Sequence, residues 1–146
     1  MEAGPGKLLL TGSASSTGTT TINAGGTLQV GNASTTGVLN TGVITNNGTL
    51  IYNRSDVTNT IAAKISGTGA LVDQGSGTLT LTGANDYTGN TTLTAGKLSL
   101  GSASALGSGG TISFGGGTLQ YSASNTSDYS SRFSTAANQT YSLHTN

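Results

Sequence analysis

The sequence contains no cysteine and no tryptophan, and only one proline and one histidine occur among its 146 residues. Without thiols the chain cannot form a disulfide scaffold or a cysteine zinc site. Five basic and five acidic residues balance to a net charge of zero, so no strong field directs the chain to nucleic acid or anionic lipid. Apolar runs stop at three residues, as in Leu8-Leu9-Leu10, whereas a membrane-spanning helix needs about 20.

Glycine, threonine, serine and asparagine together supply 82 of the 146 residues. These residues form helices poorly, and no window carries a sustained run of Ala, Leu, Glu and Lys, so a helical protein is excluded. A flexible linker is another class with such a composition, but disordered chains usually combine low hydrophobicity with a high net charge. The apolar residues of this chain are instead grouped in short alternating clusters.

Pairs of apolar residues two positions apart recur along the chain. This spacing places both side chains of a pair on one face of a β-strand. The pairs are Leu8/Leu10, Leu28/Val30, Leu50/Tyr52, Leu79/Leu81, Leu98/Leu100, Ile112/Phe114, Leu119/Tyr121 and Tyr141/Leu143. Because turn residues separate them, they predict an all-β protein made of many short strands.

The chain repeats itself at an offset of 71 residues. Residues 6–25 and 77–96 are identical at 11 of 20 positions, and removal of one residue at Gly26 extends the two repeats to 6–37 and 77–108. A smaller unit, Gly-Thr-Leu, begins at Gly26, Gly48, Gly77 and Gly117. The offset divides into three units of roughly 24 residues, within the range of solenoid repeats.

Units of this size with short strands fit the coils of a right-handed parallel β-helix, or β-solenoid. A propeller blade needs four strands in about 40–45 residues and is therefore excluded. We expect a single β-solenoid segment over residues 1–146, with about six or seven short coils spaced ~4.8 Å apart. Leu, Ile and Val should point inward, Thr, Ser and Asn should face outward or lie in turns, and Gly should form the sharp corners.

A resemblance to a known family is carried by residues 77–98, which read GTLTLTGANDYTGNTTLTAGKL. This stretch resembles the passenger-associated transport repeat of type V autotransporters. Residues 6–30 resemble it more weakly, with Ser13–Ser16 in place of Ala84–Tyr87. The resemblance implies a β-helical fragment of a larger passenger, secreted or displayed on the surface of a Gram-negative bacterium through an outer-membrane barrel outside this sequence. The repeat of that family brings no catalytic residues.

Residues with catalytic or metal-binding chemistry are few and scattered. His144 lies two residues from the end, where a Ser-His-Asp triad could not be held in place. The carboxylates are Glu2, Asp56, Asp73, Asp86 and Asp128. In a solenoid Asp73 could approach Asp56 or Asp86, but the capping of turns is the favoured interpretation. We therefore predict no catalytic, cofactor-binding or metal-binding residue.

Two groups of larger side chains suggest binding hypotheses. The tyrosines could form an exposed strip for sugar stacking, although packing on the core or on turns is favoured; they are Tyr52, Tyr87, Tyr121, Tyr129 and Tyr141. Residues 122–134 interrupt the repeat and could form a loop outside the solenoid. There we expect Phe133 to enter the core and Arg132 to pair with Asp128. Residues 53–57 are a second candidate loop.

The functional prediction is a non-enzymatic structural stalk that assists export and display of an autotransporter passenger. The alternatives are an adhesin-type module for host-cell or glycan surfaces and a self-assembling extracellular fibre subunit. A carbohydrate-active enzyme is least favoured because no acidic cluster is visible. The expected partners are the rest of the passenger and its barrel, with no nucleic acid. Strand alternation at Leu8–Leu10 and Tyr141–Leu143 predicts open coil ends that associate end to end.

Overall fold

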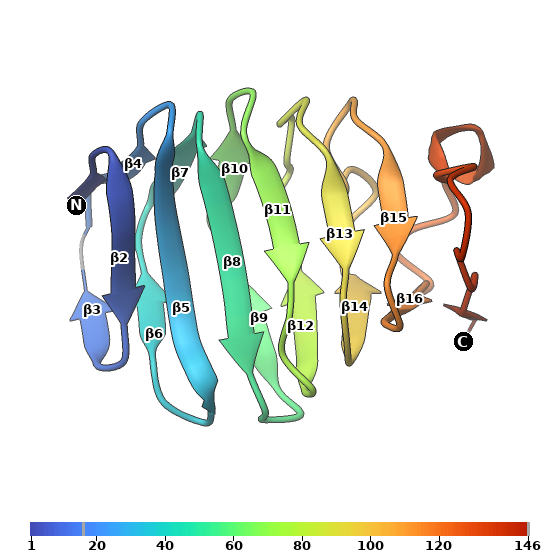
Figure 1. Ribbon diagram of the computed structural model, residues 1–146, viewed down its shortest axis with the longest axis horizontal. Coiled ribbons are helices and arrows are strands. Elements are labelled where there is room, and N and C mark those ends of the chain that lie inside the picture. The colour runs from blue at the N-terminus through green and yellow to red at the C-terminus, as the bar shows by residue number, and fades with distance from the viewer. Residues whose placement is uncertain (16, 146) are drawn as a thin grey trace.

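The computed structural model describes residues 1–15 and 17–145 and shows an all-β parallel solenoid of about seven turns (Figure 1). Every strand pair in these two ranges is parallel. The coils follow one another along a single axis, with the N-terminus at one end and the C-terminus at the other. The predicted fold class is therefore confirmed.

Three faces surround the core. The first contains β1 (Glu2–Ala3), β4 (Thr19–Ile22), β7 (Val43–Asn46) and β10 (Lys64–Ser66). The second contains β2 (Gly6–Leu10), β5 (Gly26–Ser34), β8 (Thr49–Arg54), β11 (Ala70–Asp73), β13 (Thr91–Leu93) and β15 (Ile112–Phe114).

The third face is divided between two sheets. One contains β3 (Ser13–Ser15) and β6 (Val38–Asn40). The other contains β9 (Asn59–Ile61), β12 (Thr78–Leu81), β14 (Lys97–Leu100), β16 (Thr118–Gln120) and β17 (Leu143–His144). A short 3-10 turn, η1 (Ser130–Arg132), precedes β17.

No helix within the described ranges has the length and hydropathy that are needed to cross a membrane.

Inward side chains of the second face stack in register along the axis. Leu28, Leu50 and Leu71 are aligned and buried, and Thr91 and Ile112 continue the same column. Each buried leucine is worth about 2–5 kcal/mol relative to alanine. Since each coil packs only on its two neighbours, these columns provide most of the cohesion between coils.

The coils are shorter than the sequence repeat suggests. The aligned positions Leu8, Leu28, Leu50, Leu71 and Thr91 are 20 to 22 residues apart. The expected unit of roughly 24 residues is therefore wrong.

The physical reason is that the two sequence repeats begin on different faces. Leu8 lies on β2 of the second face, whereas its repeat counterpart Leu79 lies on β12 of the third face. The Gly-Thr-Leu unit marks the start of a strand rather than the start of a coil, because Gly26 and Gly48 lead into the second face and Gly77 leads into the third. The offset of 71 residues corresponds to three coils plus one face.

A column of glycines lines the corner before the second face. A Cβ atom at Gly89 would lie 2.1 Å from the carbonyl oxygen of Gly69, and one at Gly110 would lie 2.1 Å from that of Gly89. The same contact recurs at Gly69 over Gly48 (2.4 Å) and at Gly48 over Gly26 (2.2 Å). The backbone of one coil therefore occupies the space that a side chain of the next coil would need, and only glycine fits.

Buried asparagines extend the hydrogen bonding of the first face beyond its last strand, β10. Asn85 is 4% exposed; its Oδ1 accepts from the Ile65 N–H at 2.8 Å and its Nδ2 donates to the Ala105 carbonyl at 2.7 Å. Asn46 Nδ2 similarly donates to the Ala70 carbonyl at 2.9 Å. An amide has both a donor and an acceptor, so it can replace a backbone unit. The expectation that Asn lies outward or in turns is wrong at Asn85.

Residues 122–134 form part of the last coil, and the prediction of a loop outside the solenoid is wrong. Phe133 forms a parallel bridge with Ile112, and its ring packs edge-on against Phe114 at a centroid distance of 5.1 Å. The ring of Tyr141 lies 5.4 Å from that of Phe114 and 5.6 Å from that of Phe133. Phe133 thus packs on the core as expected, within an aromatic cluster at the C-terminal end.

Apolar side chains are exposed at both ends of the solenoid. Leu8 and Leu9 on β2 are 40% and 43% exposed, and Tyr141 and Leu143 are each 49% exposed. Because β2 is the terminal strand of its sheet, its outer edge has no neighbouring strand there. End-to-end association through these edges stays a prediction.

Replacement of Gly89 by alanine tests the glycine column. Because the new Cβ would meet the Gly69 carbonyl at 2.1 Å, Gly89→Ala should lower the free energy of unfolding by about 1–3 kcal/mol. The matched control is Gly115→Ala, whose Cβ would have its nearest neighbour at 3.6 Å and should change stability by less than about 0.5 kcal/mol. Equal melting temperatures of the two variants by circular dichroism would contradict the close contact.

Candidate functional site

The structure places the scattered carboxylates in different surroundings. Asp86 forms an ion pair with Lys64 across neighbouring coils, with its Oδ2 2.6 Å from Nζ and both side chains about half exposed. Asp128 caps η1, because its Oδ1 accepts a hydrogen bond from the Ser130 N–H at 2.8 Å. This bond lowers the pKa of the Asp128 carboxyl. The expected capping of a turn is therefore seen at Asp128, whereas Asp86 forms an ion pair.

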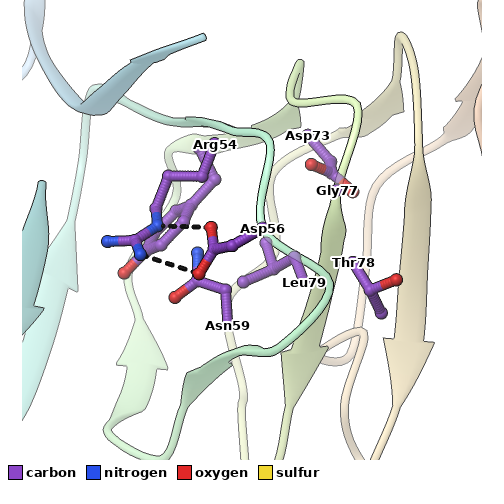
Figure 2. A pocket seen from close by; sticks show the side chains of 8 residues that line it. Arg54, Asp56, Asn59, Asp73, Gly77, Thr78 and Leu79 are labelled. Carbon is purple, nitrogen blue, oxygen red and sulfur yellow. Dashed lines mark hydrogen bonds and ion pairs between the residues drawn. The ribbon is translucent and has the colours of Figure 1, made fainter. Parts of the chain in front are cut away.

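Asp56 and Asp73 line a common recess between the turns that follow β8 and β11 (Figure 2). The two turns stack because β8 and β11 are paired neighbours. Arg54, Asn59 and Thr78 line the same recess. Of the two approaches that the sequence allows for Asp73, the structure shows the one to Asp56.

Arg54 and Asp56 form a two-pronged ion pair on one side of this recess (Figure 2). Arg54 Nε donates to Oδ1 at 2.9 Å, and Nη2 donates to Oδ2 at 2.8 Å. These hydrogen bonds lower the pKa of Asp56 and raise the pKa of Arg54. The Arg54 side chain is only 9% exposed, so this bidentate pair is stronger than an ordinary surface pair.

The other donors of Arg54 bridge the break in the third face. Strand hydrogen bonds do not join β6 to β9, which belong to separate sheets. Arg54 Nη2 donates to the Thr35 carbonyl at 2.8 Å and Nη1 donates to the Gly37 carbonyl, both in the turn before β6. Arg54 therefore links two coils where the backbone ladder of this face is interrupted.

Asp73 lies on the other side of the recess. It is the last residue of β11 and is 3% exposed, and its Oδ2 has no hydrogen-bond partner in the part of the chain that the structure describes. Burial raises the pKa of Asp73 to about 8, although the Gly75 backbone N–H opposes this shift. At neutral pH this carboxyl group is therefore mostly protonated.

The tyrosines do not form an exposed strip, because Tyr52, Tyr87 and Tyr129 are at most 5% exposed. The Tyr87 hydroxyl lies 2.8 Å from Thr91 Oγ1, and burial raises the pKa of Tyr87 to about 12. The Arg132 guanidinium lies 5.5 Å from the centre of the Tyr129 ring. The packing interpretation is confirmed for these three tyrosines, and the strip for sugar stacking is wrong.

Arg132 binds backbone carbonyl groups instead of Asp128, so the predicted ion pair is wrong. Its guanidinium donates to four carbonyls in the turn of the preceding coil, those of Leu106, Gly107, Gly109 and Gly110. The planar guanidinium has five N–H donors and can therefore hold several carbonyls at once. Arg132 and Arg54 both fasten a turn of the coil before their own.

His144 lies exposed on β17, in register with Gln120. Over residues 1–15 and 17–145, no group of three or more His, Asp or Glu side chains could hold a metal ion. That the chain has no catalytic, cofactor-binding or metal-binding residue stays a prediction.

Sequence reasoning missed the burial of Asp73, although a signal is present. Leu71 and Asp73 have the same two-residue spacing as Leu50 and Tyr52, so strand alternation places the carboxyl group inward. The pair escapes notice because its second member is polar.

Comparison with known protein families gives two matched stretches. The family described as Passenger-associated-transport-repeat matches residues 3–30 and 71–100. The chain carries autotransporter passenger repeats. It is a β-helix segment of an autotransporter passenger, a class that is displayed on or secreted from Gram-negative bacteria. The two matched stretches contain most of the two sequence repeats, and they lie on the solenoid described above.

A curated protein with similarity to this passenger segment is "Adhesin BmaC autotransporter" of Brucella suis biovar 1 (strain 1330). The two are 46% identical over 68 residues, which cover 47% of this chain and 2% of that protein. The segment thus spans only a small part of the relative's length. No solved structure matches the segment significantly.

Replacement of Arg132 by methionine should destabilise the passenger segment. Methionine keeps an apolar stem but leaves four carbonyls without their charged donor, so we expect a loss of about 1–3 kcal/mol. Lys64→Met removes a half-exposed ion pair and should cost less than about 1 kcal/mol. Thermal unfolding followed by circular dichroism measures both, and losses of the same size would show that the Arg132 contacts contribute nothing special.

Proposed function

We propose that this segment is a non-enzymatic stalk section of an autotransporter passenger. It holds other passenger regions away from the outer membrane and supports their export by folding outside the cell. The observation that carries the proposal is the single core, which runs through about seven coils along one axis. The passenger-repeat match supplies the context.

The physical basis is the nearest-neighbour character of the stack. Each folded coil offers strand edges and an apolar cross-section to the coil beside it, as Leu50 does to Leu28 and Leu71. Successive coils can therefore fold one after another as the chain emerges. A coil that has folded outside is too wide to return through a narrow pore, so its folding favours forward movement. The partners in this process are the rest of the passenger and its barrel, which anchors the chain in the outer membrane.

Adhesion is a second candidate function, favoured by the similarity to a protein that is named an adhesin. In this case the outward faces of the coils would contact a host-cell or glycan surface. Shared passenger repeats explain the similarity equally well, so we place the stalk first.

Deletion of coils in and out of register tests the stalk proposal. The segment is placed between a signal peptide and an autotransporter barrel in a Gram-negative host, and display is measured with external antibody and protease. Deletion of residues 71–90 removes one coil and leaves Thr91 in the place of Leu71, so display should persist. Deletion of residues 71–80 breaks the stacking of all later coils and should reduce display several-fold. Equal display of the two deletion variants would contradict the proposal.

Adhesion is tested with beads that carry the purified segment. Binding to host cells and to a glycan array is compared with that of beads carrying an unrelated β-solenoid without net charge. The stalk proposal predicts equal binding, whereas a clear excess for this segment would favour adhesion.

A further inference from the structure

Asp73 occupies an inward position in a column of otherwise apolar and aromatic side chains. It is in register with Tyr52 on one side and with Leu93 on the other, and the column continues to Val30 and Phe114. Each of these residues is at most 3% exposed. A carboxyl group therefore lies where the neighbouring coils have side chains that pack without hydrogen bonds to water.

The surroundings of Asp73 offer little compensation for a negative charge. Its Oδ2 has no hydrogen-bond partner among the described residues, and the recess beside it is too small for a water molecule. The Gly75 backbone N–H gives partial stabilisation. Burying an ionised carboxylate without a partner is costly, so the neutral form is favoured in the folded chain.

The groups that face Asp73 do not supply a cation. From β8 comes Tyr52, whose pKa is raised by burial, so its hydroxyl stays neutral. From β13 comes Leu93. The turns around the recess contribute Asn59, Thr78 and Leu79 and the charged residues Arg54 and Asp56. The charge of Arg54 is engaged by Asp56, and Figure 2 shows this pair on the side of the recess away from Asp73.

We propose that folding of this segment is coupled to the uptake of one proton by Asp73, so that the central coils are most stable in acid and loosen as the pH rises. The pH window follows from the two states of the carboxyl group. In the unfolded chain its pKa has the ordinary value of about 3.9, and burial raises it to about 8 in the folded chain. Below pH ~4 both states are protonated and the contribution of Asp73 to stability is fully present.

Between about pH 4 and pH 8 the unfolded chain is ionised while the folded chain keeps its proton. Each pH unit in this window should therefore lower the folding equilibrium constant about tenfold, with a levelling off above about pH 8.

Equilibrium unfolding by urea from pH 4.5 to pH 8 tests the coupling. The folding equilibrium constant of the wild-type chain should fall about tenfold per pH unit relative to that of Asp73→Asn, which keeps the size of the side chain but cannot ionise. Asp86→Asn is the matched control, since Asp86 is half exposed and paired with Lys64; it should retain the wild-type slope. Parallel pH profiles of the wild-type chain and Asp73→Asn would overturn the proposal.

A direct titration keeps the proposal testable if Asp73→Asn does not fold. The chain has only four aspartates, so the carboxyl carbon signals of the ¹³C-labelled wild-type protein can be assigned individually. The Asp73 signal should titrate with a midpoint above pH 6, and a midpoint below pH 5 would overturn the proposal. Both measurements use the purified chain, so they do not depend on whether it acts in export.

Discussion

The close approach of backbone to backbone at the corners is the constraint on which the rest of the solenoid depends. At the corner before the second face, a glycine of one coil lies directly over a carbonyl of the previous coil, as Gly89 does over Gly69. This contact keeps the corners at the same spacing as the paired strands, about 4.8 Å. The leucine columns can then stack in register. The turns also stack, and this brings Arg54, Asp56 and Asp73 to one place.

The few charged residues of the chain are used mainly inside the structure. Arg54 and Arg132 each donate several hydrogen bonds to carbonyls in the turn of an adjacent coil, where regular strand pairing is absent. Asp56 holds Arg54 in position, whereas Asp73 lies in the core without a cation. A chain that is nearly free of surface charge thus uses guanidinium groups to fasten its irregular turns.

The sequence predicts the solenoid because most inward positions are apolar. Pairs such as Leu28/Val30 and Leu79/Leu81 lie on strands with both side chains buried. The alternation is hidden where a polar residue points inward, as at Asn85. Its amide replaces backbone hydrogen bonds between coils, and this role depends on neighbours about 20 residues away.

The candidate site was less predictable than the fold. The approach of Asp56 to Asp73 follows from the stacking of coils, but the burial of Asp73 depends on which side of β11 it occupies. The partner of Arg132 could not be predicted as Asp128 or as a carbonyl, because backbone acceptors are present at every residue and leave no mark in the sequence. Coil length was missed because the same Gly-Thr-Leu unit opens strands on two faces.

The offset between the two passenger repeats has a consequence for what the surface presents. Since 71 residues correspond to three coils plus one face, the second copy is rotated about a third of a turn around the axis relative to the first. Equivalent outward side chains, such as Leu9 and Thr80, therefore look in different directions. A duplication of this length distributes one sequence around the circumference instead of aligning it in a stripe. A neighbouring molecule that approaches from one side meets a single copy.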